Sequence, residues 1–321
     1  MNATKRLPVL AMLGVMIVIA ACGGSNGTLG SVPPIVATPS ASVASFEPDL
    51  TPAPSVTPTV EPSSQPSASQ TASPTETMIV RTYFILGGEL ESVGLVPVLR
   101  EVPKSVAVAA AAMNALLAGP TAEESSGRTI TSAVPDGSEL LGLAIRNGVA
   151  TVDLSTEFDS GGGSASMQYR LAQVVYTLTQ FTTVKSVVFQ IEGQTVTVFG
   201  SEGIVLTGPV GRADFTDQLP SLFVDRPAHG AALGNPGRVT GNANVFEATF
   251  RIALLDAAGK TLVDQQVMAT CGTGCRGTFE TTLNYTVAKA QWGTLRVYDP
   301  SEKDGTPQDI RDYPVWLTPA P

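Results

Sequence analysis

The 321-residue chain is long enough for two ordinary domains, because one hydrophobic core usually serves about 100 to 200 residues. Charged residues make up only 15% of the sequence, below the roughly 25% typical of globular chains, and the net charge is −9. Nucleic acids and anionic lipid headgroups are bound mainly through Lys and Arg, so this acidic chain without a basic cluster is expected to bind neither directly.

Residues 1–21 are typical of an export signal, with Lys5 and Arg6 at the start, an apolar run over residues 7–19 and small residues after it. The run is shorter than the roughly 20 apolar residues of a membrane-spanning helix. Ile19-Ala20-Ala21-Cys22 resembles a bacterial lipobox, whose cysteine is acylated, for example with palmitate, and becomes the mature N-terminus. We therefore expect lipidation of Cys22 and an extracytoplasmic, membrane-anchored protein. A chance cysteine after an ordinary signal peptide is the alternative.

Residues 22–78 are expected to be the lipidated cysteine followed by a disordered stalk. From Gly23 to Thr77 the chain has no Lys or Arg, and ten prolines fall between Pro33 and Pro74 among Ser, Thr and Ala. Such a segment buries too little apolar surface to offset the entropy of ordering, and it extends by up to about 3.1 Å per residue. Whether the stalk is O-glycosylated stays open.

Residues 79–212 show the mixture of strand and helix patterns that is typical of an α+β domain. We expect strands over residues 79–86, 95–102, 140–145, 149–154, 187–191 and 195–199, and a helix over 106–117. Pro103 is placed to start that helix, and Gly119-Pro120 ends it. Asn147-Gly148 favours a tight hairpin turn.

A second helix is expected after Gly161–Gly163, capped by Ser164 or Ser166. Its apolar residues fall on a single stripe, which must face a sheet. They are Met167, Leu171, Val174, Val175 and Leu178. The expected architecture is an α/β sandwich with its helices on one face of the sheet.

Five stretches of this domain resemble the GerMN domain, which is named from spore germination proteins and also occurs in bacterial lipoproteins. They are PVLREV (97–102), ALLAGPT (115–121), VPDG (134–137), GVATVDL (148–154) and QVVYTL (173–178). The resemblance implies an α/β fold similar to the ring-building domains of envelope assemblies. It also implies protein association and transfers no catalytic residue.

Residues 220–318 lose the helical period and are expected to form an all-β sandwich. The expected strands cover residues 222–224, 243–255, 261–269, 278–283, 293–298 and 310–317. The stretches VTGNANVFEA (239–248), DAAG (256–259) and SEKDG (301–305) are similar to the immunoglobulin-like domain of bacterial spore germination proteins, which often follows a GerMN domain.

Cys271 and Cys275 are expected to form a disulfide, because export places them in an oxidising compartment and two glycines let the short loop close. The alternative, a redox-active thiol pair, conflicts with the spacing, which is not Cys-x-x-Cys.

The residues available for catalysis are few, and we expect no enzyme, no cofactor and no metal site. His229 is the single histidine, so a histidine-based triad or metal site would depend on it, and it falls in a loop. Asp153, Glu157 and Asp159 could be imagined as a carboxylate pair or cation site, but acids before a Gly-rich turn are more often turn groups. Gly161–Gly163 lacks the spacing of a phosphate-binding loop.

The sequence thus predicts a non-catalytic envelope lipoprotein that presents two domains to envelope proteins or wall material, and it leaves the oligomeric state open. One rival is a ligand- or glycan-binding lipoprotein, for which a pocket lined by Trp292, Trp316 or tyrosines would argue. The other rival is a secreted hydrolase that uses carboxylates such as Asp153.

Overall fold

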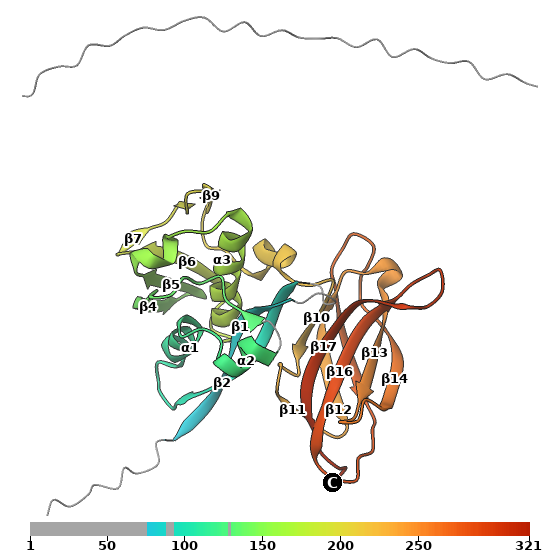
Figure 1. Ribbon diagram of the computed structural model, residues 1–321. Helices are drawn as coiled ribbons and strands as arrows, with labels where there is room; N and C mark the ends of the chain where they lie inside the picture. The colour runs from blue at the N-terminus through green and yellow to red at the C-terminus, as the bar shows by residue number, and fades with distance from the viewer. Residues whose placement is uncertain (1–75, 88–92, 128–129) are drawn as a thin grey trace, which may run out of the picture. The chain divides into compact units, whose positions relative to one another are not determined.

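The computed structural model describes residues 76–87, 93–127 and 130–321, which belong to one compact unit spanning Ser69–Pro321 (Figure 1). The predicted signal peptide, Cys22 and nearly all of the predicted stalk lie outside the described residues. The described part is mostly β-sheet with few helices. No helix within it is long and apolar enough to cross a membrane.

The first domain begins with a sheet in the order β2-β1-β3, whose long antiparallel pair is β1 (Thr77–Leu86) and β2 (Gly94–Pro103). Strand β3 (Ile130–Thr131) pairs only with the end of β1. Pro103 was predicted to start a helix, but it is the last residue of β2, and helix α1 begins five residues later at Val108–Leu117. Pairing with β1 extends β2 to Pro103, beyond the point at which the local sequence predicts the strand to end.

A second sheet of the same domain has the order β4-β5-β6-β7. Its strands are β4 (Leu140–Arg146), β5 (Val149–Leu154), β6 (Ser186–Ile191) and β7 (Gln194–Thr195). The predicted turn between β4 and β5 is confirmed, with positive φ at Asn147 and Gly148. The last predicted hairpin is only partly correct: β7 is two residues long, and β8 (Val198–Phe199) pairs with β9 (Ile204–Val205) instead of β6.

Helix α3 (Ser164–Leu178) connects β5 to β6, which run parallel. The predicted apolar stripe is buried, but the expectation of one sheet with helices on one face is too simple, because β1 and β5 belong to different sheets. Neither Ser164 nor Ser166 caps the helix; Gly163 is the N-cap residue, without a side-chain cap.

Polar side chains of the same helix, together with Gln180 just beyond its end, cover the open edge of β1. Thr177 Oγ1 accepts the amide hydrogen of Tyr83 at 3.2 Å, and Gln173 Nε2 donates to the Tyr83 carbonyl at 2.9 Å. Gln180 Oε1 accepts from the Arg81 amide at 2.8 Å and its Nε2 donates to the Arg81 carbonyl. These three side chains therefore satisfy backbone groups that a neighbouring strand would otherwise bind.

The second domain has two sheets, in the orders β10-β12-β15 and β11-β17-β16-β13-β14. Their bounds are β10 (Leu222–Arg226), β11 (Ala232–Leu233), β12 (Gly237–Ala243), β13 (Thr249–Leu255), β14 (Thr261–Met268), β15 (Gly277–Leu283), β16 (Gln291–Pro300) and β17 (Pro307–Leu317). Phe250 of β13 and Phe279 of β15 pack edge to face at 4.8 Å, which joins the two sheets through one core.

The strand predicted over residues 243–255 is wrong as a single element. Strand β12 ends at Ala243 and β13 starts at Thr249, with the short 3-10 helix η3 (Phe246–Ala248) between them. Glu247 and Ala248 have positive φ, which breaks the extended backbone where the chain passes from one sheet to the other.

Candidate functional site

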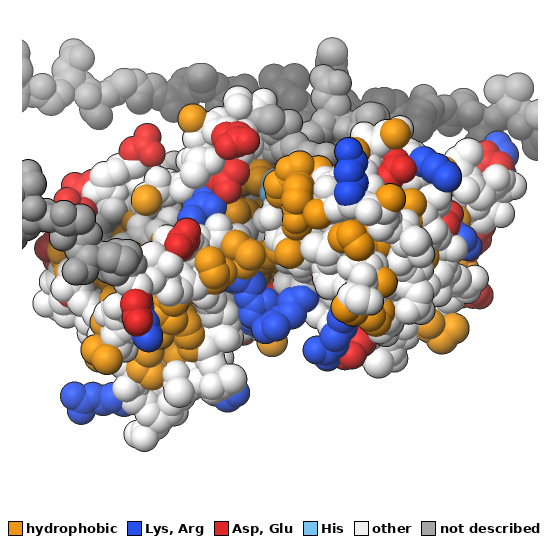
Figure 2. Space-filling model, turned by 90° about the horizontal axis from the view of Figure 1, so that it is seen from below, with side chains coloured by type: hydrophobic (Ala, Val, Ile, Leu, Met, Phe, Trp, Pro, Cys, Tyr) orange, Lys and Arg blue, Asp and Glu red, His pale blue; other side chains and the backbone are white. Residues whose placement is uncertain are grey.

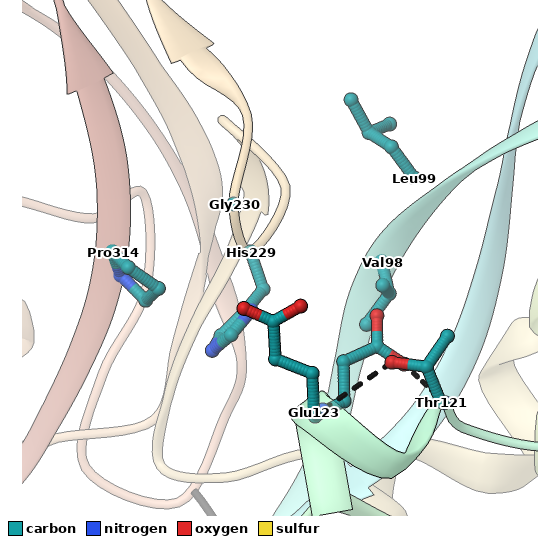
Figure 3. A pocket seen from close by; sticks show the side chains of 8 residues that line it. Val98, Leu99, Thr121, Glu123, His229, Gly230 and Pro314 are labelled. Carbon is teal, nitrogen blue, oxygen red and sulfur yellow. Dashed lines mark hydrogen bonds between the residues drawn. The ribbon is translucent and has the colours of Figure 1, made fainter. Parts of the chain in front are cut away.

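A cleft of about 460 Å³ lies where β2 and helix α2 (Ala122–Gly127) of the first domain meet the second domain (Figure 3). Its lining residues are Val98, Leu99, Thr121, Glu123, Glu124, His229, Gly230 and Pro314. The His229 loop is held by backbone contacts on both sides. The His229 amide donates to the Pro97 carbonyl at 2.8 Å, and the Gly230 amide donates to the Pro314 carbonyl at 2.9 Å.

The acidic wall of the cleft is built by the start of α2. The Thr121 hydroxyl accepts the amide hydrogen of Glu124, and the Glu124 carboxylate accepts that of Thr121 at 2.8 Å, which is a capping box. Arg100 binds both Glu124 oxygens, at 2.7 and 2.6 Å. Partial burial raises the pKa of Glu124, but hydrogen bonds from Arg100 and Thr121 outweigh it and hold that pKa below its usual value. The polar groups of Thr121 and Glu124 are therefore engaged in capping the start of α2.

Figure 3 shows the exposed Glu123 carboxylate on the side of the cleft where His229 lies. The cleft thus combines one imidazole and one exposed carboxylate with apolar side chains. The hydroxyl that lines it belongs to the capping threonine. This set offers a polar contact surface and gives no Ser-His or Cys-His arrangement among the lining residues.

A second polar cluster joins the two domains through Asp225 of β10. The Tyr83 hydroxyl donates to Asp225 Oδ1 at 2.7 Å, and Arg81 Nη1 lies 3.0 Å from Asp225 Oδ2. Arg212, in the 3-10 helix η2 (Arg212–Gln218), donates to the Tyr83 hydroxyl at 3.2 Å and stacks over the Tyr176 ring at 4.6 Å. One carboxylate therefore receives contacts from β1 and lies close to a guanidinium of η2.

The tyrosines of this cluster stay protonated at neutral pH. Burial, followed by the charge of Asp225, raises the pKa of Tyr83 above its usual value. Burial raises the pKa of Tyr176 to about 12. Burial lowers the pKa of Arg212, but the effects of Tyr83 and Asp225 outweigh burial and raise that pKa above its usual value. This guanidinium therefore stays charged. Tyr83, Tyr176 and Arg212 therefore do not titrate near neutrality.

Arg311 of β17 is fully buried between the domains. Its Nη2 donates to the carbonyls of Gly94 at 3.1 Å and Leu95 at 2.9 Å, both in β2, and its Nε donates to the Tyr313 hydroxyl at 3.0 Å. The Tyr313 hydroxyl also accepts the amide hydrogen of Val224 at 3.2 Å. A single side chain of the second domain thus satisfies backbone carbonyls at the start of a strand in the first.

The three acids singled out in the sequence serve separate turns. Asp153 Oδ1 accepts the Gly193 amide hydrogen at 2.8 Å, and Asp159 Oδ1 accepts that of Gly200 at 2.7 Å. A hydrogen bond from Ser155 lowers the pKa of the exposed Glu157. Within the described residues, no group of three or more His, Cys, Asp and Glu side chains is placed to hold a metal ion.

The glycine-rich loop before α3 folds around the buried guanidinium of Arg170. This side chain donates to the carbonyls of Phe158 at 2.6 Å, Ser160 at 3.0 Å and Gly161 at 3.0 Å. The loop therefore turns carbonyl oxygens toward a cation, whereas a phosphate cradle directs amide hydrogens toward an anion.

Cys271 and Cys275 lie in the loop between β14 and β15, with their sulfur atoms adjacent and their Cα atoms 5.8 Å apart, a separation that a disulfide spans. The loop is docked on η3 and the residue before it: the Thr273 amide donates to the Val245 carbonyl at 2.9 Å, and the Thr273 hydroxyl accepts the Glu247 amide hydrogen at 2.9 Å. The bond itself stays a prediction.

Residues 81–197 match the family model described as Germane, sporulation and spore germination. Residues 221–306 match the model Gmad2, the immunoglobulin-like domain of bacterial spore germination. The protein carries a GerMN-like domain followed by an immunoglobulin-like domain of the spore germination type. This confirms the resemblance that the sequence stretches indicated.

Among solved structures, the chain is similar to the tandem GerMN domains of the sporulation protein GerM from Bacillus subtilis, with 17% identity and a TM-score of 0.38 over 65% of this chain. The chain spans 62% of that structure's length. It is also similar to the first GerMN domain of the same protein, with 24% identity and a TM-score of 0.36 over 43% of this chain and 99% of that one. A search of curated proteins finds no match.

The charged residues that join the GerMN-like and immunoglobulin-like domains were not predicted from the sequence. A signal for one of them was present. Strand alternation places Arg311 on the same face as Tyr313, Val315 and Leu317, which are buried, and a charge on a buried face requires a polar partner. Asp225 gave a similar signal, because it directly follows three apolar residues in β10.

Proposed function

We propose that the protein is a non-catalytic, extracytoplasmic lipoprotein, anchored to the cell membrane through Cys22, that presents its two domains to other envelope proteins or to wall material. The lipobox-like segment and the Pro-rich stalk support the anchor. The GerMN-like and immunoglobulin-like domains support a role in an envelope process of the sporulation or germination type. The proposed cell-surface location also supports a Cys271–Cys275 disulfide.

The commitment of reactive side chains to structure supports the non-catalytic part of the proposal. Thr121 and Glu124 cap a helix, Asp153 and Asp159 bind turn amides, and Arg170 organises a loop. Each of these side chains is therefore engaged in a structural contact.

The observation that best supports association with a protein partner is an uncovered apolar face in the GerMN-like domain. Val106 is fully exposed, Ile145 is 38% exposed, and both line a groove of about 250 Å³ between α1 and the edge strand β4. Hydrophobic side chains reach the surface of this domain at the lower left of Figure 2. A protein that keeps apolar side chains beside an unpaired strand edge has a surface suited to a protein partner.

The test compares the wild-type protein with Cys22→Ala in intact cells. The wild type is expected in the membrane fraction, with crosslinks to other envelope components, whereas Cys22→Ala is expected in the soluble extracytoplasmic fraction with those crosslinks lost. Wild-type protein that stays in the cytosol without an acyl group on mass spectrometry would overturn the anchor. Turnover of a substrate by the purified protein would overturn the non-catalytic role.

A second candidate function, glycan binding, is favoured by one pair of residues. Trp292 of β16 and Trp316 of β17 are directly opposite each other and exposed, and their ring centroids are 5.2 Å apart. Neither of them lines the cleft at His229. Quenching or enhancement of tryptophan fluorescence by wall glycan fragments, lost in Trp316→Ala, would favour this candidate over protein association.

A further inference from the structure

Strand β4 of the GerMN-like domain presents an unpaired edge. Among the described residues its only ladder partner is β5, and it forms one margin of the sheet β4-β5-β6-β7. A two-residue turn joins the two strands, so Arg146 and Val149 form the hydrogen-bonded pair next to the turn, and the pattern alternates from there. The amide and carbonyl groups of Leu143 and Ile145 are therefore directed away from β5.

The usable part of this edge is short and well defined. The register between β4 and β5 shifts between Leu140 and Gly142, and such a bulge interrupts regular pairing. Residues 142–146 form the regular stretch that follows. Its two faces differ: Leu143 and Ile145 share the face of the buried Val152 and Ala150 opposite them, and Ala144 and Arg146 lie on the other face.

We propose that this edge pairs with the same edge of a second copy of the chain, antiparallel and centred on Ala144, which deepens the proposed association function and rests on it. The arrangement places Gly142 opposite Arg146 of the second copy, and Leu143 opposite its Ile145. Every residue of the regular stretch then has a partner. A register centred on Leu143 would instead extend the pairing into the bulge at Leu141.

The apolar side of the edge fits a copy of itself. Leu143 and Ile145 of both copies would meet on the face that α1 covers only in part, next to Val106 and the groove between α1 and β4. This contact removes apolar side chains from water in both chains at once, which provides the driving force.

Charge complementarity favours a second copy over an unrelated apolar segment. Arg146 would lie opposite Gly142 of the second copy, and Gly142 pairs across its own sheet with Asp153. Since glycine has no side chain, the guanidinium can extend over it toward the Asp153 carboxylate, which already accepts the Gly193 amide hydrogen. The two-fold axis of an antiparallel pair repeats this contact at the other end.

The contact is small, so its strength depends on where the chains are. A five-residue edge buries less than the roughly 800 Å² per partner of a standard interface. Two chains anchored in one membrane gain an effective concentration that free chains lack. The dimer is thus expected on membranes and is expected to dissociate on dilution in detergent.

Disulfide trapping of the full lipid-anchored chain in membranes tests the pairing. Ala144 would face its counterpart in a non-hydrogen-bonded pair with a Cα separation of about 4.5 Å, inside the range of disulfides. Mild oxidation of Ala144→Cys is expected to convert most of the chain to a dimer on a non-reducing gel. Thr151→Cys is the matched control, because it lies opposite Ala144 on β5 and about 14 Å from its counterpart, three strand spacings away.

A second pair of variants separates the interface from random collision. Adding Ile145→Lys to Ala144→Cys is expected to abolish the dimer, whereas adding Val205→Lys, an exposed apolar residue in the β8-β9 hairpin, is expected to preserve it. The pairing is wrong if Ala144→Cys stays monomeric, if Thr151→Cys dimerises equally, or if the dimer survives Ile145→Lys. A monomeric Ala144→Cys whose membrane location and envelope crosslinks persist would remove this inference and leave the proposed function standing.

Discussion

The Tyr83 hydroxyl donates to Asp225 Oδ1 at 2.7 Å, which connects a buried strand of the GerMN-like domain to the first strand of the immunoglobulin-like domain. Asp225 also pairs with Arg81 and lies 3.9 Å from Arg212. The carboxylate is the shared acceptor of this network. Removing its charge leaves the guanidinium groups of Arg81 and Arg212 close together without a neutralising carboxylate. A single substitution should therefore weaken the contact between the two domains strongly.

Asp225→Asn is therefore expected to lower the free energy of unfolding by about 2 to 4 kcal/mol, because it breaks a partly buried ion pair from one side. Urea unfolding followed by circular dichroism measures the change. The control is Glu280→Gln, which breaks the exposed Arg238–Glu280 pair and should change stability little. An equal effect of both substitutions would contradict the assigned role of Asp225.

Arg311→Lys is expected to destabilise the protein although it keeps the charge. A lysine cannot reproduce the set of contacts that the guanidinium makes with the Gly94 and Leu95 carbonyls and the Tyr313 hydroxyl, so buried acceptors lose their donors at a cost of about 1 to 3 kcal/mol. Limited proteolysis should detect cleavage near residue 94 at a lower urea concentration than in the wild type. The same change at exposed Arg238 should leave the proteolysis pattern unaltered.

The polar face of α3 gives a prediction about sheet edges. Thr177→Val removes the acceptor of the buried Tyr83 amide hydrogen, and we expect a loss of about 1 to 3 kcal/mol from the desolvated donor. Hydrogen exchange at the Tyr83 amide, measured by NMR, should accelerate in the variant. Gln190→Leu is the control, because its amide binds the hydroxyl of exposed Thr195. Unchanged protection of Tyr83 would show that the helix does not hold this edge.

Local chemistry made part of the fold predictable. The hairpin at Asn147-Gly148 was predictable because both residues tolerate positive φ, and the buried stripe of α3 was predictable because helical period is a property of the segment alone. The covering of β1 by Gln173 and Thr177 was not, since it depends on a strand about 90 residues earlier in the chain. Polar residues on a helix are normally interpreted as its solvated face.

The candidate site was less predictable than the fold for the same reason. His229 and Glu123 come from different domains and only the folded chain brings them to one cleft. The break at Glu247 depends on positive φ in residues that rarely adopt it, and no local pattern predicts that. One local signal was present: a threonine followed three residues later by a glutamate, as at Thr121 and Glu124, is typical of a capping box.

Glu124 should make stability depend on pH in a defined direction. Its pKa is lower in the folded state than its ordinary value of 4.5, so its contribution is fully present above that value and is lost as the pH falls through the folded pKa. The melting temperature of the wild type should exceed that of Glu124→Gln at pH 7, and the difference should shrink steadily below pH 4.5. Glu202→Gln, in an exposed turn, should give no such trend. A constant difference down to pH 3 would argue against the Arg100 contact as its cause.

The Cys271–Cys275 pair gives a prediction in which a small effect is the expected result. The ring is short, so closing it removes little entropy from the unfolded chain, and the double variant Cys271→Ser, Cys275→Ser should lose about 2 kcal/mol or less. Mass spectrometry after alkylation in denaturant should show both cysteines unmodified unless a reductant is added first. Alkylation of either cysteine without reductant would show that the bond is absent. If the bond is present, reductant should lower the urea midpoint of the immunoglobulin-like domain by about 1 M or less, because the docked loop is also held by the Thr273 amide and hydroxyl.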